Sequence, residues 1–275
     1  RRERGRLGAR GAQAVKDHDD LSDLVDQDDG GQPQPAAPHT LPWNHFPVDG
    51  LLGGGAAGHI YRAHRHDGAA SLALKVFKGA VTSDGLPEHE LAACLAAGQH
   101  PALCTPFAAL AGHPQGASGL LLPLIPPGFV NLGGPPSLDS CTRDVFPPGL
   151  RLSAAMALRV ASQMAGAVAH LHQRGVMHGD LYAHNILWNP VSGQALLSDF
   201  GAGTLLPVMD AAQARALQAL EVRAFGYLLE ELLALVDATA ALDGMAAITH
   251  DCLNPVPAER PAMAEVAWQL ARLAQ

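Results

Sequence analysis

The chain has 275 residues, of which 48% are hydrophobic, 16% charged and 5% aromatic, and its formal net charge is −8. A chain of this length can bury roughly 75% of the surface that its unfolded form exposes, so a sizeable core is possible and disorder throughout is excluded. The acidic balance disfavours a nucleic-acid binder that relies on phosphate contacts. No apolar run approaches the roughly 18 residues that span a bilayer, so we expect no membrane segment.

The four cysteines are scattered, without the spacing of a zinc ribbon or a disulfide framework. They are Cys94, Cys104, Cys141 and Cys252. Their distribution favours a reducing compartment, and we expect a cytoplasmic protein.

Residues 1–45 lack apolar periodicity and are rich in charge, proline and glycine. This composition predicts a disordered tail or linker. The aspartates of the segment do not have the ligand spacing of an EF-hand loop, so calcium binding is not expected. The folded domain is therefore expected to comprise residues 46–275.

Short apolar runs separated by glycine and turn signals begin at residue 46. They predict strands at 51–52, 60–63 and 72–77, with Asp67-Gly68 as a hairpin turn between the last two. Residues 88–97 are dense in alanine and leucine and predict a helix. Two further strands are expected, at 106–111 and 119–125.

After Pro126-Pro127-Gly128 the apolar pattern becomes mostly helical. A helix is expected over 154–172, with Ser153 as its N-cap, and another over 214–236. Strands in the first part and helices in the second predict an α+β fold with segregated lobes. The N-lobe is expected at 46–125 and the C-lobe at 126–275.

A glycine-rich segment, Gly53-Gly54-Gly55-Ala56-Ala57-Gly58-His59-Ile60, matches the pattern G-x-G-x-x-G-x-[V/I]. Glycines allow a close approach that a Cβ would prevent, so such a loop can cover phosphates with its N–H groups. The pattern also fits the dinucleotide-binding fingerprint, which requires a helix directly after the loop. Residues 60–63 predict a strand there instead. A phosphate-covering loop and a flexible turn both remain open.

Lys75 lies in the apolar run Leu72-Ala73-Leu74-Lys75, although the chain has only three lysines against fifteen arginines. A lysine kept in such a position indicates a site that requires a compact ammonium group.

Further along, the chain contains His178-Gly179-Asp180-Leu181-Tyr182-Ala183-His184-Asn185, followed by Ser198-Asp199-Phe200-Gly201. A carboxylate can accept a proton from an attacking hydroxyl. An asparagine five residues later and a second aspartate offer the hard oxygen ligands that Mg²⁺ prefers.

In this order the motifs resemble the protein-kinase family over residues 46–275, and they are most similar to bacterial kinases associated with leucine-rich repeats. The resemblance implies a two-lobed protein-kinase-like fold and an ATP- and Mg²⁺-dependent enzyme. It implies that Gly53, Gly55 and Gly58 cover the ATP phosphates. Lys75 would contact the α- and β-phosphates with Glu90 as its ion-pair partner, although Glu88 is a competing choice.

The same resemblance assigns Asp180 as the catalytic base and Asn185 and Asp199 as metal ligands. It also implies an adenine site. Ile60, Ala73 and Leu187 would enclose the base, and Leu122 would precede a hinge that contains Leu124. Glu221-Val222-Arg223-Ala224-Phe225-Gly226 is similar to the buried helix that begins with Asp in this family, and Cys252 through Arg260-Pro261 to its closing element.

The chain departs from the family's pattern in several places. Gly179 replaces the arginine that receives an activation-loop phosphate, and Thr204 is the only hydroxyl residue between Phe200 and Glu221. We therefore expect activity without activation-loop phosphorylation. No A-P-E sequence is present, so Arg260 is expected to lack its usual glutamate partner and the peptide platform to be reduced.

The acceptor class is not marked. Tyr182 replaces the lysine of Ser/Thr kinases, and His184 stands where tyrosine kinases have arginine, so His184 could supply positive charge near the γ-phosphate or simply pack in its loop. A zinc cluster of His170, His172, His178 and His184 is not favoured, because supporting Cys or acidic ligands are missing.

Three functions are considered. The first is a kinase that phosphorylates a serine, threonine or tyrosine hydroxyl of a protein substrate. The second is a small-molecule phosphotransferase similar to aminoglycoside and choline kinases, and the third is a nucleotide-binding pseudokinase. No nucleic-acid or membrane partner is expected.

Overall fold

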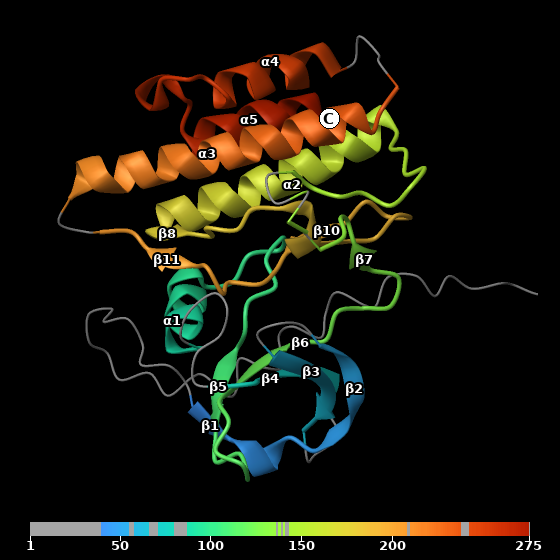
Figure 1. Ribbon diagram of the computed structural model, residues 1–275, viewed down its shortest axis with the longest axis vertical. Helices are drawn as coiled ribbons and strands as arrows, with labels where there is room; N and C mark the ends of the chain where they lie inside the picture. The colour runs from blue at the N-terminus through green and yellow to red at the C-terminus, as the bar shows by residue number, and fades with distance from the viewer. Residues whose placement is uncertain are drawn as a thin grey trace, which may run out of the picture.

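The computed structural model of the chain describes residues 40–54, 58–65, 71–79, 87–135, 137–138, 140, 143–207, 210–237 and 242–274. Strands dominate the first part of this range and helices the second, as Figure 1 shows. The expected α+β fold with two lobes is therefore confirmed. Residues 1–39, Gly55, the Asp67-Gly68 turn and Cys141 lie outside the described residues.

The N-lobe contains a six-stranded sheet in the order β1-β5-β6-β4-β3-β2. Neighbouring strands are antiparallel, except that β1 runs parallel to β5. The strands are β1 (Thr40–Pro42), β2 (Val48–Gly54), β3 (Gly58–His64), β4 (Ser71–Phe77), β5 (Ala108–Ala111) and β6 (Gly119–Pro123).

Side-chain alternation along β4 separates the two faces of this sheet. Lys75 is the register partner of Ile60 on one side and of Leu120 on the other, so these three side chains share a face. The adjacent residue, Leu74, points to the opposite face and is completely buried in a small core with Phe46. Both edges of β4 are paired, with β3 and β6, and its residues from Leu72 to Lys75 are buried, so the lysine is held in an apolar setting.

The N-lobe begins before the expected boundary at residue 46. Thr40–Pro42 forms β1 and Trp43–His45 forms the short 3₁₀ helix η2. Leu41 and Trp43 pack against the small core of the sheet. A strand of three residues is too short to show an apolar period in the sequence. Its place in the fold depends on pairing with β5, which lies far along the chain. The expectation of a disordered tail for residues 1–39 stays a prediction.

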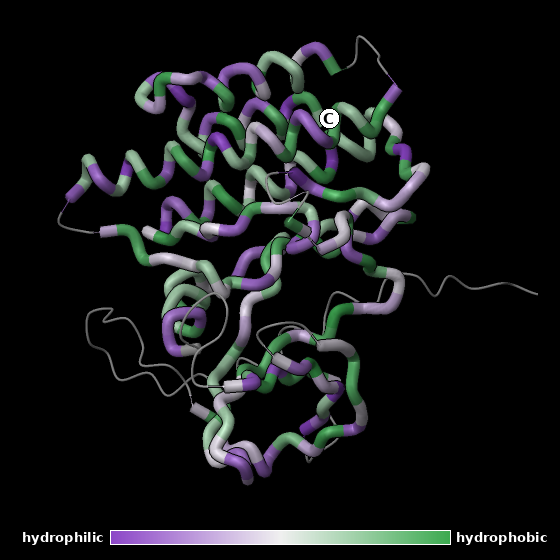
Figure 2. The backbone as a smooth tube through the Cα atoms, in the orientation of Figure 1, coloured by the Kyte–Doolittle hydropathy of each residue, from purple (hydrophilic) through white to green (hydrophobic). Residues whose placement is uncertain are grey.

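The helices are α1 (Pro87–Ala97), α2 (Ala154–Gln173), α3 (Ala211–Ala234), α4 (Asp243–Cys252) and α5 (Met263–Leu273). Ser153 caps α2 as expected, because its hydroxyl accepts a hydrogen bond from the Met156 N–H at 3.2 Å. The Asp210 carboxylate caps α3 by accepting bonds from the Ala212 and Gln213 N–H groups. Figure 2 shows hydrophobic and hydrophilic residues alternating along α2 and α3, and the apolar positions of both helices join the main core.

Short strands and 3₁₀ helices lie in the loops that connect the helices of the C-lobe. Pairing occurs among β7 (Val130–Asn131), β9 (Ile186–Trp188) and β10 (Ala195–Leu197), and between β8 (Val176–Met177) and β11 (Thr204–Leu205). The 3₁₀ helix η3 (Ala183–Asn185) lies in the loop that precedes β9, and η5 (Pro257–Glu259) lies before α5. β8 ends directly before the segment from His178 to Asn185, and β9 begins directly after it, so the two strand pairings hold both ends of this segment.

The helices and the cysteines bear on the predicted absence of a membrane segment and on the predicted reducing compartment. Within the described residues, none of the helices combines the length and the apolar content that a membrane crossing requires. Cys94, Cys104 and Cys252 are free and buried, and burial raises the pKa of the Cys104 thiol to about 11.

Candidate active site

Lys75 is the centre of an ion-pair cluster between the two lobes. Its Nζ donates to Oε1 of Glu90 at 2.6 Å and lies 3.5 Å from Oδ1 of Asp199. Glu90 is buried, whereas Glu88 is exposed. The structure thus forms the expected pair with Glu90 and leaves Glu88 outside the cluster.

The charge of Lys75 is preserved although its side chain is buried. Burial alone would lower the pKa of the ammonium group, but the nearby carboxylates of Asp199 and Glu90 raise it above its usual value. Lys75 is therefore a fixed cation, which suits contact with phosphate oxygens.

Asp199 has a left-handed backbone with φ of 60°, the only positive φ of a non-glycine residue in the described part of the chain. Its Oδ1 accepts a hydrogen bond from the Gly201 N–H at 3.3 Å. Phe200 turns the other way and is buried against the ring of His178, with 5.0 Å between the ring centroids. Nε2 of His178 in turn lies 3.0 Å from the Ser198 carbonyl oxygen. This packing holds the Asp199 carboxylate toward Lys75.

Asp180 and Asn185 are joined at the other side of the site. The Asn185 amide donates to Oδ2 of Asp180 at 2.8 Å and to the Asp180 carbonyl at 2.9 Å. The ring of His184 places Nε2 3.6 Å from the same Oδ2. The proximity of His184 and the bond from Asn185 lower the pKa of Asp180 despite its partial burial, so the carboxylate is ionised at neutral pH.

His184 lies between two carboxylates. Its Nδ1 is 3.9 Å from Oδ1 of Asp144, opposite the contact with Asp180. Asp144 and Asp180 raise the pKa of His184 to about 9, although burial opposes the shift. The imidazole is therefore charged at neutral pH.

Asn185 and Asp199 offer side-chain oxygens of the kind that a divalent cation prefers. Both amide bonds of Asn185 go to Asp180, and its Oδ1 accepts no hydrogen bond from the described residues. The Asn185 carbonyl accepts bonds from the N–H and the hydroxyl of Ser198, which places the two predicted ligands in adjoining segments. A neutral amide oxygen and a carboxylate are hard ligands of the kind that Mg²⁺ prefers.

The four histidines that a zinc cluster would use have separate partners. Nε2 of His170 lies 2.8 Å from the Ala97 carbonyl, and His172 pairs with Glu221 at 2.8 Å. His178 and His184 make the contacts described above. Among the described residues, no group of three or more His, Cys, Asp or Glu side chains is arranged to hold a metal ion.

The predicted glycines have different surroundings. Gly53 pairs with Ile60 and has open space where a Cβ would be, which leaves room for a ligand. At Gly58 a Cβ would lie 2.4 Å from the Val76 carbonyl oxygen, so this glycine is required by the packing of β3 on β4. Gly55 lies outside the described residues.

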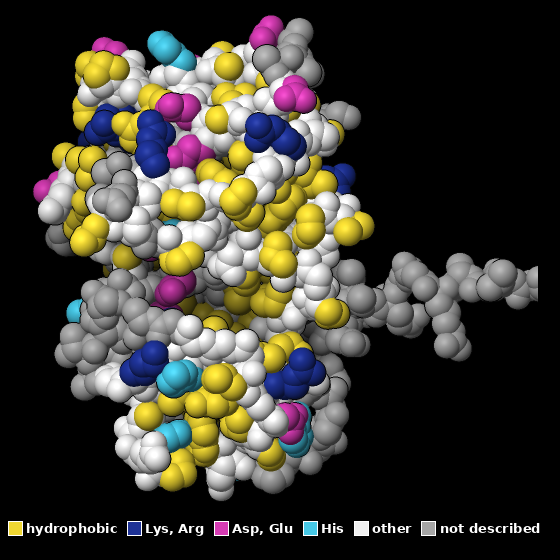
Figure 3. All heavy atoms as spheres, turned by 45° about the vertical axis from the view of Figure 1, so that its right-hand side comes forward, with side chains coloured by type: hydrophobic (Ala, Val, Ile, Leu, Met, Phe, Trp, Pro, Cys, Tyr) yellow, Lys and Arg dark blue, Asp and Glu magenta, His cyan; other side chains and the backbone are white. Residues whose placement is uncertain are grey.

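Four of the five residues expected around adenine lie on strands, three in the N-lobe and one in the C-lobe. Ala73 is the register partner of Leu122, and Leu187 lies on β9 in the C-lobe. Ile60 is partly exposed. Leu124 follows β6, at the connection between the lobes. Figure 3 shows hydrophobic side chains along the indentation between the lobes on the face it presents.

A cavity of about 740 Å³ lies on the other face of the N-lobe sheet, away from Lys75. Trp43, His59, Tyr61 and His113 are among its lining residues. It contains none of the predicted site residues and is separate from the ion-pair cluster.

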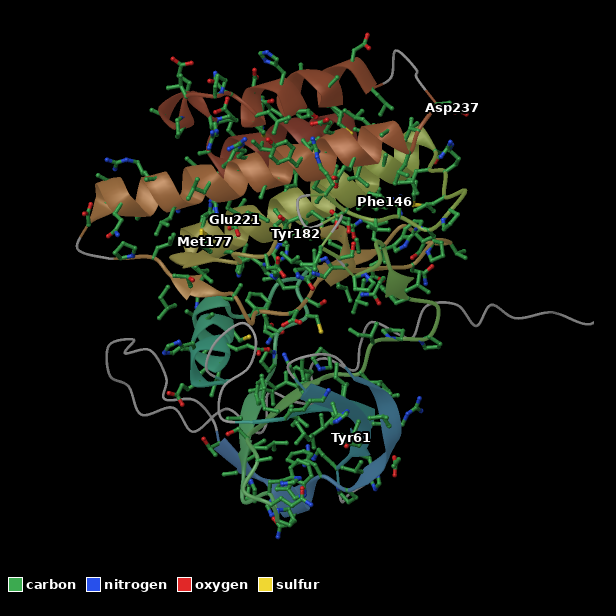
Figure 4. The ribbon with its side chains drawn as sticks, in the orientation of Figure 1. Tyr61, Phe146, Met177, Tyr182, Glu221 and Asp237 are labelled. Carbon is green, nitrogen blue, oxygen red and sulfur yellow. The ribbon has the colours of Figure 1, made fainter. Side chains whose placement is uncertain are left out.

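Glu221, inside α3, supports the loop from His178 to Asn185, which contains the predicted base and is called the catalytic loop below. Its Oε1 accepts a hydrogen bond from the Gly179 N–H at 2.8 Å, and its Oε2 lies 2.8 Å from Nε2 of His172. Figure 4 shows Glu221 near the β8 residue Met177, on the side of the helical lobe that faces the strands. Both carboxylate oxygens of this buried residue are thus satisfied.

Arg260 binds backbone carbonyls. Its guanidinium donates to Asn254 and Ala219, each at 2.8 Å. Gly226 permits the close packing of α3 on the end of α4, because a Cβ there would lie 2.9 Å from Cβ of Cys252.

Sequence reasoning did not identify Asp144 or Glu231 as site residues. Asp144 contacts the catalytic loop through Ala183 and His184, and Glu231 holds Asp144 by accepting its N–H at 3.2 Å. Neither belongs to a motif. The only signal was the Arg143-Asp144 pair in the proline-containing connection before α2.

Two comparisons with known proteins bear on this geometry. Residues 132–239 match the Lipopolysaccharide kinase (Kdo/WaaP) family, over less than half of the chain. The chain is also 28% identical over 192 residues to the serine/threonine-protein kinase AtPK2/AtPK19 of Arabidopsis thaliana. That alignment covers 69% of this chain and 37% of the length of the relative. The ion-pair cluster, the catalytic loop and these two matches support a kinase-like family for this chain.

Proposed function

We propose that the chain is an ATP- and Mg²⁺-dependent kinase that transfers the γ-phosphate to a protein hydroxyl. The observation that carries the proposal is the convergence of Lys75, Glu90 and Asp199 at ion-pair distances. An ammonium held by two carboxylates can contact phosphate oxygens without a change in its own charge. Phosphoryl transfer depends mainly on positioning and charge neutralisation, which such a cluster supplies.

Each residue has a role in this proposal. The segment from Gly53 to Gly58 covers the phosphates, and Lys75 contacts the α- and β-phosphates. Asn185 and Asp199 would hold Mg²⁺, which would neutralise phosphate charge. Asp180 accepts the proton of the acceptor hydroxyl as that oxygen attacks the γ-phosphorus, and ADP leaves.

The relative from Arabidopsis is named as a protein kinase, which supports a protein acceptor. Its alignment is also longer than the match to the Kdo/WaaP family, which lies in the C-lobe. Its 192 residues must include part of the N-lobe together with the helical region. A matched pair of assays tests the acceptor class: transfer of labelled γ-phosphate to casein by the wild-type chain and by the Asp180→Asn variant. The proposal expects labelled casein only with the wild type. Equal labelling by both would contradict the assignment of Asp180.

Activity without phosphorylation of the segment after Asp199 is part of the proposal. Thr204–Leu205 pairs with Val176–Met177, and the Leu206 N–H donates to the Gly175 carbonyl. Backbone pairing therefore holds this segment beside the catalytic loop without a phosphate. Treatment with a phosphatase should leave the transfer rate unchanged, and a large loss would contradict this part.

A saccharide or other small-molecule acceptor is the second candidate. The match to the Kdo/WaaP family covers the catalytic loop and all of α3. The chain from Phe200 to the start of α3 at Ala211 is also short, which leaves little surface for a peptide. Labelled product from a sugar and amino-alcohol panel, with none from casein, would favour this candidate. Binding of Mg²⁺-ATP without any transfer would favour a pseudokinase.

A further inference from the structure

Asp144 is a buried acid that the proposed function does not use. Only 3% of its side chain is exposed. Its Oδ2 accepts a hydrogen bond from the Ala183 N–H at 2.8 Å, inside the catalytic loop. Its Oδ1 accepts no hydrogen bond from the described residues and faces Nδ1 of His184 at 3.9 Å. Burial of a carboxylate oxygen without a hydrogen bond is unfavourable, so the position of Asp144 calls for a specific partner.

The ring of His184 connects Asp144 to the catalytic loop. Its second nitrogen, Nε2, lies 3.6 Å from Oδ2 of Asp180. The ring also stacks on Tyr182, with 5.7 Å between centroids and an angle of 23° between planes; Figure 4 labels Tyr182 on the side of the helical lobe that faces the strands. An acceptor at one imidazole nitrogen orients the ring and thereby directs the N–H of the other nitrogen.

Only one oxygen of Asp180 is involved in these contacts. Asn185 donates to Oδ2, the same atom that His184 faces. Oδ1 accepts no hydrogen bond from the described residues. With Oδ2 held from two sides, Oδ1 is the oxygen available to an acceptor hydroxyl.

Asp144 is itself held by the helical lobe. Its N–H donates to Oε1 of Glu231 on α3 at 3.2 Å. The next residue, Val145, accepts a hydrogen bond from the Gly134 N–H at 2.6 Å. The preceding residue, Arg143, forms ion pairs with α3: its Nη2 lies 3.4 Å from Oε1 of Glu230, and its Nη1 lies 3.6 Å from Oε1 of Glu231. The contacts with Glu230 and Glu231 anchor the segment between β7 and α2 to α3, and the bond between Gly134 and Val145 closes that segment on itself.

We propose that Asp144 is a positioning residue: it orients His184, which holds Asp180 so that Oδ1 meets the acceptor hydroxyl. The role rests on the phosphotransfer proposed above. Asp144 touches neither nucleotide nor acceptor in this arrangement and acts through His184 alone.

Asp144→Asn separates the two contacts of Asp144. Asparagine keeps an oxygen for the Ala183 N–H, but its amide donates and cannot accept a proton from Nδ1 of His184. The assay is ATP hydrolysis with Mg²⁺, in which water is the acceptor, together with transfer to casein. We expect kcat to fall about 10-fold, at the lower end of what loss of a histidine-orienting partner costs at metal sites. KM for ATP should stay unchanged, because Asp144 does not face the nucleotide.

A double-mutant cycle tests whether Asp144 acts through His184. In a His184→Gln background, Asp144→Asn should change kcat less than about twofold, because the residue through which it acts is already gone. Glu230→Gln is the matched control, since Glu230 is exposed and contacts Arg143 without reaching the loop. This control should keep wild-type kcat. An Asp144→Asn effect of full size in the His184→Gln background would overturn the proposal.

A spectroscopic measurement keeps the proposal testable without turnover. The ¹⁵N signals of the His184 ring, assigned by their loss in His184→Gln, should shift in Asp144→Asn and stay in place in Glu230→Gln. Unchanged ring signals in Asp144→Asn would overturn the positioning role even if the wild type is inactive. Shifted signals in a chain that transfers no phosphate would keep the orientation of His184 and reject the phosphotransfer.

Discussion

A Cβ on Gly179 would lie 2.5 Å from the carbonyl oxygen of Ala202. Gly179 also has φ of 81°, a conformation that side chains disfavour. The segment after Phe200 therefore packs directly on the catalytic loop, at the position where the kinases that this chain resembles have arginine. Glycine at this position is a packing requirement of the structure.

Gly179→Ala should lower both stability and activity. The added Cβ meets a backbone oxygen in addition to the strain at positive φ, so we expect a loss of about 1–3 kcal/mol in the free energy of unfolding. Gly175→Ala is the matched control, because Gly175 has φ of 71° but open space around its Cβ position. Denaturant unfolding should show a larger loss for Gly179→Ala than for Gly175→Ala; equal losses would remove the contact with Ala202 as a cause.

Lys75→Met should reduce phosphoryl transfer by on the order of 10²–10³ in kcat, the usual cost of removing one charge-stabilising contact. The variant also removes the ion pair between Lys75 and the buried Glu90, which destabilises the fold. Lys75→Met combined with Glu90→Gln also removes the buried charge that Lys75 balances, and it should recover stability in thermal melts while activity stays low. Recovery of activity in the double variant would show that Lys75 acts only through the fold.

Removal of Mg²⁺ should weaken the binding of ATP. A nucleotide at 100 times its Kd stabilises the folded state by about 2.7 kcal/mol, which a thermal shift detects. With Mg²⁺-ATP we expect a rise in Tm that EDTA reduces and that Asp199→Asn largely abolishes. Glu259→Gln, far from the cleft in η5, provides a control that should keep the full rise. A rise that persists in Asp199→Asn with and without EDTA would contradict the ligand assignment.

The pH dependence of stability should report on Glu231. Burial, opposed by the bond from the Asp144 N–H, raises the pKa of Glu231 from 4.5 to about 7. Because the folded-state pKa is raised, the stabilisation from proton binding is complete below about pH 4.5 and is lost as the pH rises through about 7. The Glu231→Gln variant has no ionisable group at this position. Compared with that variant, the free energy of unfolding of the wild type should fall as the pH rises from about 4.5 to about 7. If the free energies of unfolding of the two proteins change in parallel over this pH range, the raised pKa of Glu231 would be refuted.

Much of the site could be predicted from local sequence. The loop from His178 to Asn185 and the Ser198–Gly201 segment each place their polar residues by short, fixed spacings, which do not depend on the rest of the chain. The buried strand around Lys75 is marked by its apolar neighbours, and the helices over 154–172 and 214–236 by their apolar repeat. These elements were recognisable because their physical cause lies within a few residues.

Other features depended on contacts between distant segments. Glu88 and Glu90 are two residues apart, so they point in different directions from α1, and only the docking of that helix decides that Glu90 meets Lys75. Asp144 reaches Ala183 across 39 positions of sequence, with no repeat or spacing that connects them. Local sequence determined which groups the chain carries to the cleft. The tertiary structure decided which carboxylate faces each cation, because charge pairing over such separations requires the packed lobes to bring the groups together.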